Sequence, residues 1–338
     1  MPERKFSRLL VIRNDRLGDV MLILPLLEAL ATVLPETQIE VLIQNSLTAV
    51  FDNHPIVRHV LGDSGERIGK LADIIRAGSY DAVVVVNPTW RNALAARRSG
   101  VKWRVGQGNR LQGILFNHRV RFHRSQMEMH EAEYHLLYLT GLGITPPAEL
   151  PRPRLTVNRQ STGRIEQLLT EQGIDLSKPI VGLHPGSGGS SRPWPAANYR
   201  ALGEKLLATG YQVVISGGAG EKELAESMAM PGMVDLTGQT DLSELIALLA
   251  RLAVFVSIDT GPMHVAAALG VPTVSIFSPQ RGNAPRRWHP LGNRYTILQP
   301  EGISCGKCGS CACPDPECMS RVSVDAVLDA VLKTMAQK

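Results

Sequence analysis

One stretch of the second half places residue types that bind phosphate between an apolar run and a segment of small residues. An apolar, β-branched run, Val254–Ile258, is followed by the polar turn Asp259–Pro262 and the small-residue segment Met263–Leu269. The pattern predicts a buried parallel strand, a tight turn and a short helix. Backbone N–H groups, the Thr260 hydroxyl and the His264 side chain would then lie at the positive end of a helix dipole, where phosphate binds readily. An ordinary capped turn uses similar residue types, so that alternative stays open.

Two other loops of the second half have similar chemistry. His184–Arg192 is rich in glycine and hydroxyl groups and follows an apolar run, and Gly217–Gly220 follows another. Each glycine alone only indicates a turn, but three N–H-rich loops at one sheet edge favour a nucleotide site. Neither the dinucleotide-binding motif nor the P-loop motif occurs, which argues against a dehydrogenase and a P-loop NTPase. Arg192 is either a cation over the phosphates or an ordinary surface arginine.

In the first half, Asp19 is the carboxylate best placed for chemistry. Arg8–Arg13 predicts a strand, Asn14–Asp19 a polar turn, and Val20–Leu34 an apolar helix. Gly18 and Asp19 would therefore stand at a helix N-terminus. There Asp19 is either an N-cap or a general base that accepts a proton from an attacking hydroxyl.

All five cysteines lie in one segment near the C-terminus: Cys305, Cys308, Cys311, Cys313 and Cys318. This confinement argues against the disulfide framework of a secreted domain. In a reducing compartment, closely spaced thiolates predict a tetrahedral Zn site first and an Fe–S site second. Unligated thiols are the remaining alternative. In every case we expect a structural role.

The elements that must position these residues alternate between strands and helices. In the first half we predict strands at Arg8–Arg13, Ile39–Ile43, Ala82–Val86 and Val101–Val105, and helices at Val20–Leu34, Ile68–Ala77 and Gln126–Gly141. In the second half we predict strands at Ile180–Leu183, Gln212–Ser216, Val254–Ile258 and Thr273–Phe277, and helices at Ser161–Gln172, Ala197–Thr209, from Glu221, and at Leu242–Leu252. This alternation predicts an α/β fold with parallel sheets covered by helices on both faces.

The chain has 338 residues, a length that fits two domains. A Pro-rich stretch, Thr145–Pro153, separates the halves, and we place the boundary between residues 150 and 151. We predict Rossmann-like domains at 1–150 and 151–338, the second including the Cys-rich segment 305–318 and a C-terminal helix. Their functional loops would follow the carboxyl ends of the strands and imply a cleft between the domains.

Charge is unevenly distributed, although the net charge is only +5. Between Asp81 and Glu128 there is no acidic residue, but the interval contains nine cationic residues: Arg91, Arg97, Arg98, Lys102, Arg104, Arg110, Arg119, Arg121 and Arg124. The interval is either an anion-facing surface or a solvated face. We expect Arg97, Arg98 and Arg104 to contribute to binding an anionic acceptor. No apolar run of about 18 residues could span a membrane, and no signal-peptide core follows the N-terminus, so we expect a cytoplasmic protein.

Three motifs together resemble family 9 glycosyltransferases: R-N-D-R-L-G-D-V near the N-terminus, H-P-G-S before R-P-W-P, and D-T-G-P-M-H-V-A-A-A-L-G. This is the heptosyltransferase family of lipopolysaccharide core assembly, which has the GT-B fold of two Rossmann-like domains. The resemblance implies ADP-L-glycero-D-manno-heptose as the donor and an anionic glycolipid, the lipopolysaccharide core, as the acceptor. It also implies an N-terminal acceptor domain, a C-terminal nucleotide-sugar domain and peripheral contact with the inner membrane surface.

The matched motifs also imply roles for single residues. Asp19 matches the general base, Arg192 stands where the family usually has lysine, and Thr240 lies where the family approaches the nucleotide base. Glu221 and Glu223 compete for a ribose contact. The full set of implied donor-binding residues is Gly18, Ser187, Arg192, Glu221, Thr240, Asp259, Thr260, Gly261, Met263 and His264. The family pattern favours Cys305, Cys308, Cys313 and Cys318 as metal ligands and leaves Cys311 over.

These residues predict an inverting transfer in which Asp19 deprotonates the acceptor hydroxyl. No D-x-D motif occurs in the chain, so we expect no catalytic metal. Three alternatives stay open: a family member with another nucleotide sugar or with a protein or small-molecule acceptor, a GT-B epimerase or hydrolase, and a non-enzymatic protein that binds nucleic acid or anionic lipid. The basic interval has little aromatic interleaving and no nucleic-acid-binding motif, so we expect no nucleic-acid partner.

Overall fold

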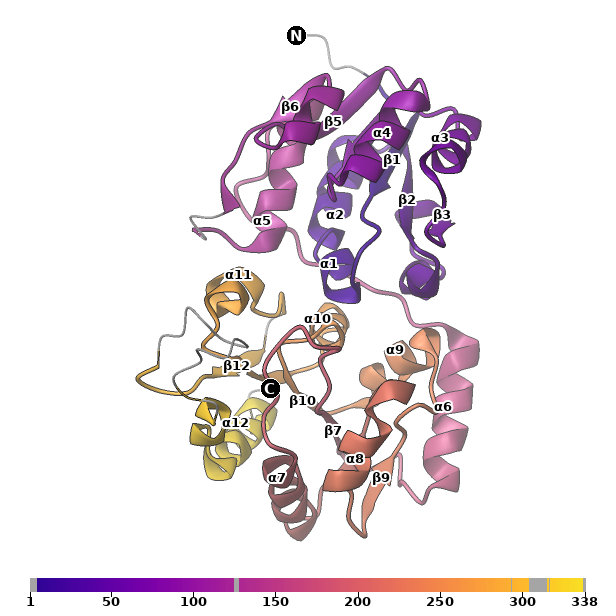
Figure 1. The fold of residues 1–338 in the computed structure, drawn as a ribbon. Helices are drawn as coiled ribbons and strands as arrows, with labels where there is room; N and C mark the ends of the chain where they lie inside the picture. The colour runs from indigo at the N-terminus through magenta and orange to yellow at the C-terminus, as the bar shows by residue number, and fades with distance from the viewer. Residues whose placement is uncertain (1–4, 125–127, 293, 304–314, 316, 337–338) are drawn as a thin grey trace. The chain divides into compact units, whose positions relative to one another are not determined.

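A computed structural model describes residues 5–124, 128–292, 294–303, 315 and 317–336. The chain forms two compact units, Met1–Thr156 and Val157–Lys338. Both are α/β units with a parallel sheet, as the alternation of elements predicts (Figure 1). No helix within the described ranges is long and apolar enough to cross a membrane.

The first unit has a six-stranded sheet in the order β3-β2-β1-β4-β5-β6, and every neighbouring pair is parallel. Its strands are β1 (Arg8–Ile12), β2 (Gln38–Gln44), β3 (Val57–Asp63), β4 (Ala82–Val85), β5 (Trp103–Gln107) and β6 (His118–Val120). The central strands are runs of β-branched and apolar residues because helices cover both of their faces. Strands β3 and β6 were not predicted; they have few apolar residues and lie at the two sheet edges.

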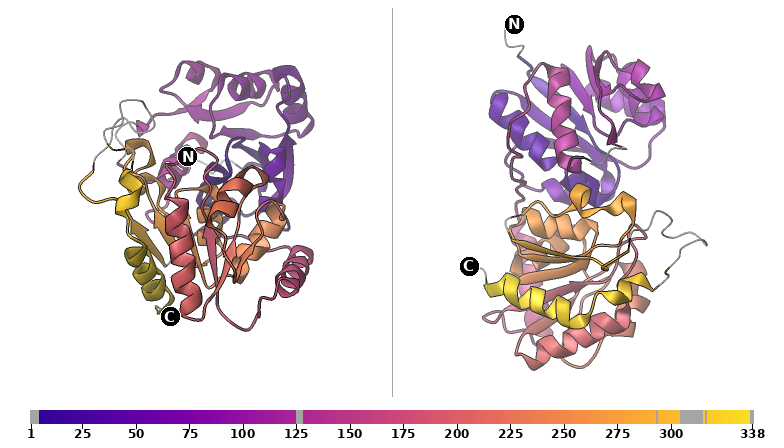
Figure 2. Two further views of the ribbon diagram at one scale, coloured as in Figure 1. Left: turned by 60° about the horizontal axis from the view of Figure 1, so that its bottom comes forward. Right: turned by 90° about the vertical axis from the view of Figure 1, so that its left-hand side faces the viewer.

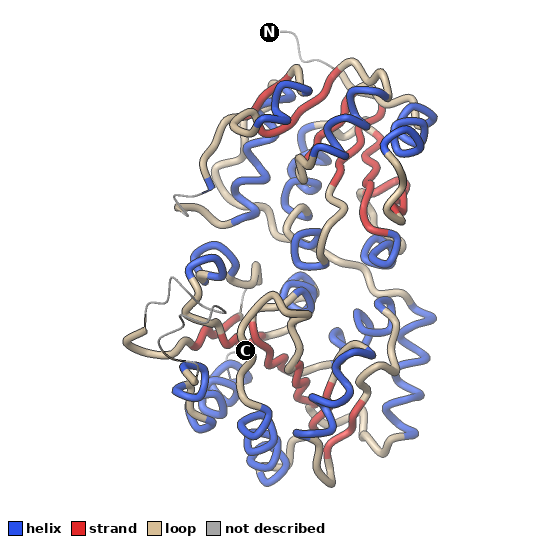
Figure 3. The backbone as a smooth tube through the Cα atoms, in the orientation of Figure 1, coloured by secondary structure: helices blue, strands red, loops and turns tan. Residues whose placement is uncertain are grey.

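The helices of the first unit are α1 (Leu17–Met21), α2 (Leu24–Val33), α3 (Ile68–Ala77), α4 (Trp90–Arg98) and α5 (Glu131–Leu136), together with the 3₁₀ helices η1 (Asn45–Phe51), η2 (Leu111–Leu115) and η4 (Leu137–Leu142). Residues of α3 and α4 pack on one set of alternating strand side chains, which includes Leu10, Ile12, Val83 and Val85. Figure 3 shows helices on both faces of each sheet.

Two helices of the first unit differ from the prediction. The predicted helix Val20–Leu34 is two helices, because Pro25 lies in the first turn of α2, where its missing N–H group is tolerated but a continuous helix is not. Within the described part of the predicted helix Gln126–Gly141, α helix is confined to α5. The His130 side chain accepts a hydrogen bond from the Ala132 N–H group and caps α5.

The second unit repeats this architecture, with strand order β12-β11-β10-β7-β8-β9, again all parallel. Its strands are β7 (Ile180–His184), β8 (Gln212–Ile215), β9 (Met233–Asp235), β10 (Val254–Ile258), β11 (Thr273–Ile276) and β12 (Tyr295–Leu298). The edge strands β9 and β12 are short and incompletely buried, and neither was predicted.

The helices of the second unit are α6 (Arg159–Glu171), α7 (Ala196–Ala208), α8 (Lys222–Met228), α9 (Leu242–Arg251), α10 (Gly261–Ala268), α11 (Pro285–Trp288) and α12 (Val324–Ala336), with the 3₁₀ helices η5 (Ala219–Glu221), η6 (Arg281–Asn283) and η7 (Cys318–Arg321). Helix α12 packs against α7 and against strands β10, β11 and β12 (Figure 2). Helix α6 packs against α9, where the hydroxyls of Ser161 and Ser243 are 2.9 Å apart.

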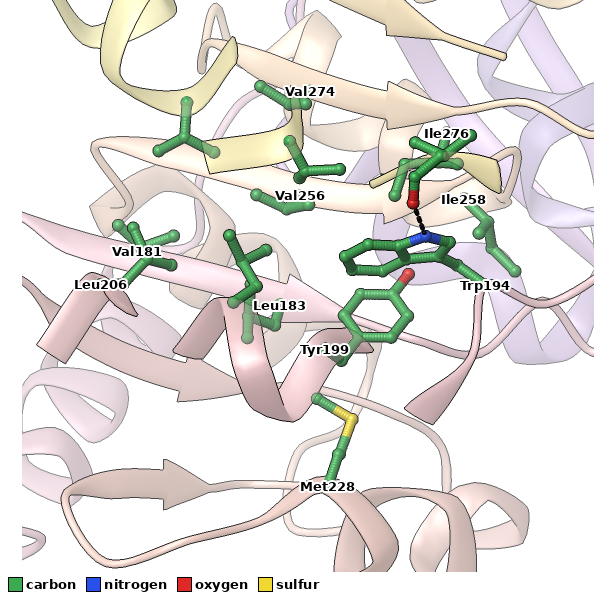
Figure 4. Packing of buried hydrophobic residues seen from close by; sticks show 14 of the residues in the cluster. Val181, Leu183, Trp194, Tyr199, Leu206, Met228, Val256, Ile258, Val274 and Ile276 are labelled. Atoms are coloured by element: carbon green, nitrogen blue, oxygen red, sulfur yellow. Dashed lines mark hydrogen bonds between the residues drawn. The ribbon is translucent and has the colours of Figure 1, made fainter. Parts of the chain in front are cut away.

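The core of the second unit joins the segment after β7 to the C-terminal segment. The buried Trp194 ring donates a hydrogen bond from Nε1 to the Val322 carbonyl at 2.9 Å (Figure 4). The ring also packs edge-on against Tyr199, with centroids 4.8 Å apart. These contacts anchor the end of the His184–Arg192 loop to residues that follow the cysteine segment.

Both sheets change direction at an inner strand. The chain begins at β1 or β7, runs outward over two strands, and then returns to the other side of the starting strand at β4 or β10. In sheets of this kind, ligands bind beyond the carboxyl ends of the strands at such a switch point. The candidate residues should therefore be sought after β1 and β4 in the first unit, and after β7 and β10 in the second.

Candidate functional site

In the first unit, Asp19 lies just beyond the carboxyl end of β1. It is in the first turn of α1 and its side chain is partly exposed. Arg16 takes the N-cap position, so the alternative role of Asp19 as the N-cap is wrong. The Asp19 carboxylate accepts a hydrogen bond from Nη2 of Arg13 instead.

The same guanidinium binds a second carboxylate. Nε of Arg13 lies 2.9 Å from Oδ1 of Asp15, and Arg13 is only 5% exposed. Burial raises the pKa of Asp15 to about 7; the charge on Arg13 opposes this rise and the charge on Asp19 adds to it. Two acidic groups therefore share one buried cation, and one of them readily holds a proton near neutral pH.

A further buried group lies within electrostatic reach of Arg13. Glu131 on α5 is 2.9 Å from Nη2 of Arg124 and 3.4 Å from Nε2 of His135. Nδ1 of His135 is 2.9 Å from the Leu22 carbonyl, at the break between α1 and α2, and burial lowers the pKa of His135. Glu131, His135, Arg13 and Asp15 were not among the predicted site residues, and Arg124 was predicted only as part of the basic interval. The available signal was the position of these polar side chains beside apolar residues.

In the second unit, the loop after β7 exposes backbone groups. Gly188 and Gly189 have φ angles of +54° and +77°, a region that favours glycine. The Ser187 hydroxyl donates to the Ser191 carbonyl at 3.1 Å and fixes the turn around the two glycines. Nδ2 of Asn283 donates to the Ser190 carbonyl at 2.7 Å, so the loop is held from the segment after β11 as well.

The loop after β8 touches the loop after β7 through Glu221. A Cβ atom at Gly186 would lie 1.7 Å from Oε1 of Glu221, so a larger residue there would displace this carboxylate. Oε2 of Glu221 accepts a hydrogen bond from the Gly218 N–H group at 2.8 Å. Glu223 is exposed on α8. Of the two candidates for the ribose contact, the structure thus brings Glu221 against the loop after β7.

The buried His184, at the end of β7, contacts the residue that follows β8. Its Nδ1 atom lies 3.1 Å from the Ser216 hydroxyl, and burial lowers the pKa of His184 while Glu221 opposes that shift. Thr240, the predicted neighbour of the nucleotide base, is partly buried after β9, directly before the Asp241 N-cap of α9.

The predicted phosphate turn follows β10. Asp259, Thr260 and His264 are buried, and α10 begins at Gly261. Thr260 takes the N-cap position, but its side chain makes no capping hydrogen bond, so capping does not explain the residue types of this turn. Met263 is fully buried in the first turn of α10. The helix ends at Ala268, close to the predicted Leu269.

The structure therefore brings most donor-binding candidates to one edge of the second sheet: Ser187 and Arg192 after β7, Glu221 after β8, Thr240 after β9, and Asp259, Thr260, Gly261, Met263 and His264 after β10. Gly18 and Asp19 belong to the first unit. Cys305, Cys308, Cys311 and Cys313 lie outside the described residues. Cys318 is buried in the second unit's core, and the described part of the chain holds no group of three or more metal-ligating side chains.

Three arginines of the basic interval do not lie at the edge where Asp19 lies. Arg97 and Arg98 end α4 and Arg104 lies near the start of β5, so all three are at the amino edge of the first sheet. Arg104 donates to the Val101 carbonyl at 2.7 Å and to the Leu115 carbonyl at 3.3 Å. These three arginines therefore lie at the edge of the first sheet opposite to Asp19, because the two ends of parallel strands lie at opposite edges. That they contribute to binding an anionic acceptor stays a prediction.

Because the pKa of Asp15 beside Arg13 is raised, we expect the free energy of unfolding to depend on pH. A protonated Asp15 is favoured in the folded state up to about pH 7, whereas an ordinary aspartate ionises near pH 3.8. Between these values the folded protein binds more protons than the unfolded chain, so this contribution to stability is lost as pH rises. Relative to Asp15→Asn, the wild-type free energy of unfolding should fall between about pH 5 and pH 7, by up to about 1.4 kcal/mol per pH unit.

Urea unfolding of both proteins across this pH range measures the difference. The exposed Asp73→Asn variant serves as the control, and its difference from the wild type should not change with pH over this interval. A difference for Asp15→Asn that is equally flat would show that Asp15 ionises at an ordinary pKa in the folded protein.

Comparison with known proteins agrees with this architecture. The model of glycosyltransferase family 9 (heptosyltransferase) matches residues 68–318. A Haemophilus influenzae relative, named as a glycosyltransferase, is 30% identical over 309 residues, covering 85% of this chain and 87% of the relative. Lipopolysaccharide heptosyltransferase 2 of Escherichia coli is 28% identical over 309 residues, covering 86% and 88%.

A solved structure has a similar fold over nearly the whole chain. The Escherichia coli ADP-heptose lipopolysaccharide heptosyltransferase II superposes with a TM-score of 0.82 at 22% identity, covering 98% of this chain and 99% of that chain. The likeness confirms the predicted fold class. The chain therefore belongs to glycosyltransferase family 9, the heptosyltransferases, and has their GT-B fold of two Rossmann-like domains.

Proposed function

We propose that this protein is an inverting, metal-independent heptosyltransferase that moves a heptose from ADP-L-glycero-D-manno-heptose to an anionic lipopolysaccharide core. The observation that carries the proposal is Asp19, a partly exposed carboxylate held by a buried guanidinium at the switch point of the first sheet. The names of two similar proteins, lipopolysaccharide heptosyltransferase 2 and ADP-heptose heptosyltransferase II, support the sugar, the donor and the acceptor class.

The second unit would bind the donor. Backbone N–H groups at the start of α10, with Thr260 and His264, would hold the diphosphate together with Ser187 and Arg192. Glu221 would accept hydrogen bonds from ribose hydroxyls, and Thr240 would lie beside the nucleotide base. The remaining candidates of the second unit would contribute by position: Asp259 and Gly261 would shape the turn, and Met263 would support it from the core. Gly18, in the first unit, stays a predicted donor contact.

In the proposed reaction, Asp19 takes the proton of an acceptor hydroxyl. The hydroxyl oxygen forms a bond to the anomeric carbon, the bond from that carbon to the diphosphate oxygen breaks, and ADP leaves with the electron pair. Attack from the side opposite the leaving group inverts the configuration. Arg13 orients Asp19 through their hydrogen bond. The N-terminus of α10 and Arg192 would stabilise the charge that grows on ADP.

The first unit would then carry the acceptor and the second the donor, as the predicted domains 1–150 and 151–338 imply. We place the protein in the cytoplasm, with peripheral contact with the inner membrane, where a lipid-borne acceptor would be met. Incubation with ADP-heptose without acceptor separates the proposal from a GT-B epimerase or hydrolase, because only those enzymes would consume the donor rapidly.

Asp19→Ala should reduce transfer at least about a hundredfold and change donor affinity by no more than a few-fold, because a general base acts on the acceptor. Initial rates of transfer and calorimetric binding of the donor measure the two effects. The control is Asp73→Ala, which removes an exposed carboxylate from α3 of the same unit. More than about a tenth of the wild-type turnover in Asp19→Ala would rule out this base.

Arg192→Ala and His264→Ala should each weaken ADP binding about tenfold or more, because each removes a charged or buried hydrogen-bonding partner of the diphosphate. Calorimetry with ADP measures the effect. Arg200→Ala is the matched control, since Arg200 is exposed on α7 and donates only to the Ala229 carbonyl among its described contacts. Unchanged ADP affinity in both test variants would place the phosphate site elsewhere.

For the cysteine segment we propose a structural Zn or Fe ion held by Cys305, Cys308, Cys313 and Cys318. The support is the spacing of the thiols and the buried position of Cys318, beside the core that contains Trp194. Elemental analysis of protein purified without metal-affinity resin should find about one equivalent per chain, and chelation should lower the melting temperature. Metal-free protein with five freely titrating thiols would support unligated cysteines instead.

A further inference from the structure

Three large apolar side chains of the first unit are unusually exposed. Leu111 is 79% exposed, Ile114 65% and Trp90 50%. Leu111 and Ile114 are three residues apart on the 3₁₀ helix η2, so they project from the same side. The neighbouring Gln112 side chain donates to the Pro88 carbonyl, close to Trp90 at the start of α4, and η2 contacts α4. Trp90, Leu111 and Ile114 therefore lie on adjoining segments, and we call these three exposed residues the apolar face.

This exposure is built into the local fold. The other side of η2 is fixed in the core, where Leu115 and Phe116 pack with residues of α4. Gly113 lies so close to the neighbouring backbone that an added Cβ atom would be 2.9 Å from the Gly108 carbonyl oxygen. Because η2 cannot turn without removing Leu115 from the core, Leu111 and Ile114 stay directed outward.

Cationic side chains border the apolar face. Arg110 and Arg119 are exposed, and the Arg119 guanidinium donates to the Phe116 carbonyl at 3.1 Å and to the Ile114 carbonyl at 3.5 Å. The chain segment that forms the face contains no acidic residue between Asp81 and Glu128. Asp63, which lies at the end of β3 beside α4, is neutralised by two hydrogen bonds of 2.6 Å from Arg91.

We propose that the apolar face docks on an anionic phospholipid bilayer, with its three side chains in the interfacial region and with Arg110 and Arg119 at the lipid phosphates. Trp, aliphatic side chains and arginine are the residues that favour this interface. Three side chains are also too few for the roughly 1,000 Å² of a stable protein partner. The small apolar area and the cationic border of the apolar face together favour an anionic membrane over a protein partner.

The position of the face fits the proposed function, on which this inference partly rests. Trp90 and Leu111 follow β4 and β5 at the carboxyl edge of the first sheet, and Asp19 follows β1 at the same edge. Docking through this face would bring the edge that carries the proposed base to the surface in which a lipid-borne acceptor is anchored.

The test is sedimentation with vesicles of phosphatidylethanolamine and phosphatidylglycerol, compared with pure phosphatidylcholine. The double variant Leu111→Asp with Ile114→Asp should lower the partition coefficient on the anionic vesicles at least about tenfold, because it replaces apolar contact with charge. The matched control, Val33→Asp with Tyr295→Asp, makes the same change at exposed apolar residues outside the face and should bind as the wild type does.

Arg110→Ala with Arg119→Ala should weaken binding to anionic vesicles and reduce its salt dependence, while retention on phosphatidylcholine stays low. Equal vesicle binding by the Leu111→Asp, Ile114→Asp variant and the wild type would overturn the proposal, and so would binding that ignores lipid charge. Circular dichroism and ADP affinity show that the variants are folded.

The failure of this proposal is distinguishable from failure of the proposed function. With a soluble, delipidated core acceptor, the Leu111→Asp, Ile114→Asp variant should transfer as fast as the wild type, and Asp19→Ala should not transfer. Asp19→Ala should still bind the vesicles. Loss of transfer to the soluble acceptor in the double variant would overturn the docking role, because it would place the apolar face in the catalytic reaction itself.

Discussion

The first unit depends on one buried guanidinium, that of Arg13. A buried arginine is costly unless its charge is compensated, and here two carboxylates, Asp15 and Asp19, compete to compensate it. One ionised carboxylate balances the cation, so the second gains from holding a proton, and burial makes Asp15 that second group. The same guanidinium orients Asp19, which lies in the first turn of α1. The position of the proposed base therefore follows from the cost of burying Arg13.

In the second unit, the candidate loops present backbone N–H groups, and these groups must be held at fixed positions to bind an anion. These loops have little side-chain bulk of their own, and contacts with neighbouring elements hold them in place. Glu221 occupies the space left by Gly186, Asn283 holds the Ser190 carbonyl, and Trp194 fixes the end of the loop through the Val322 carbonyl. The glycines thus permit close approach, and long-range packing supplies the rigidity that a preorganised anion site requires.

The basic interval shows how folding divides a continuous stretch of sequence. Arg91 and Arg124 are paired with Asp63 and Glu131, so they serve the stability of the first unit. Arg97 and Arg104 lie at the amino edge of the sheet, and Arg119 lies beside η2. A count of charges along the chain cannot separate these groups, because successive turns of a β-α-β unit alternate between opposite edges of a sheet.

The sequence by itself determined the features that depend on local pattern. Apolar runs alternating with amphipathic segments predicted the central strands, the covering helices and two Rossmann-like units, and the motif around Asp259 placed a turn at the end of a buried strand. The edge strands β3, β6, β9 and β12 were missed because a short or half-exposed strand has too few apolar residues to show a period. The tertiary structure alone decided which groups meet, such as Arg91 with Asp63, Glu221 with Gly186, and His135 with Leu22. These contacts join residues far apart in the chain, and their energies depend on burial and on which strand ends share an edge, neither of which is encoded in the local spacing of residues.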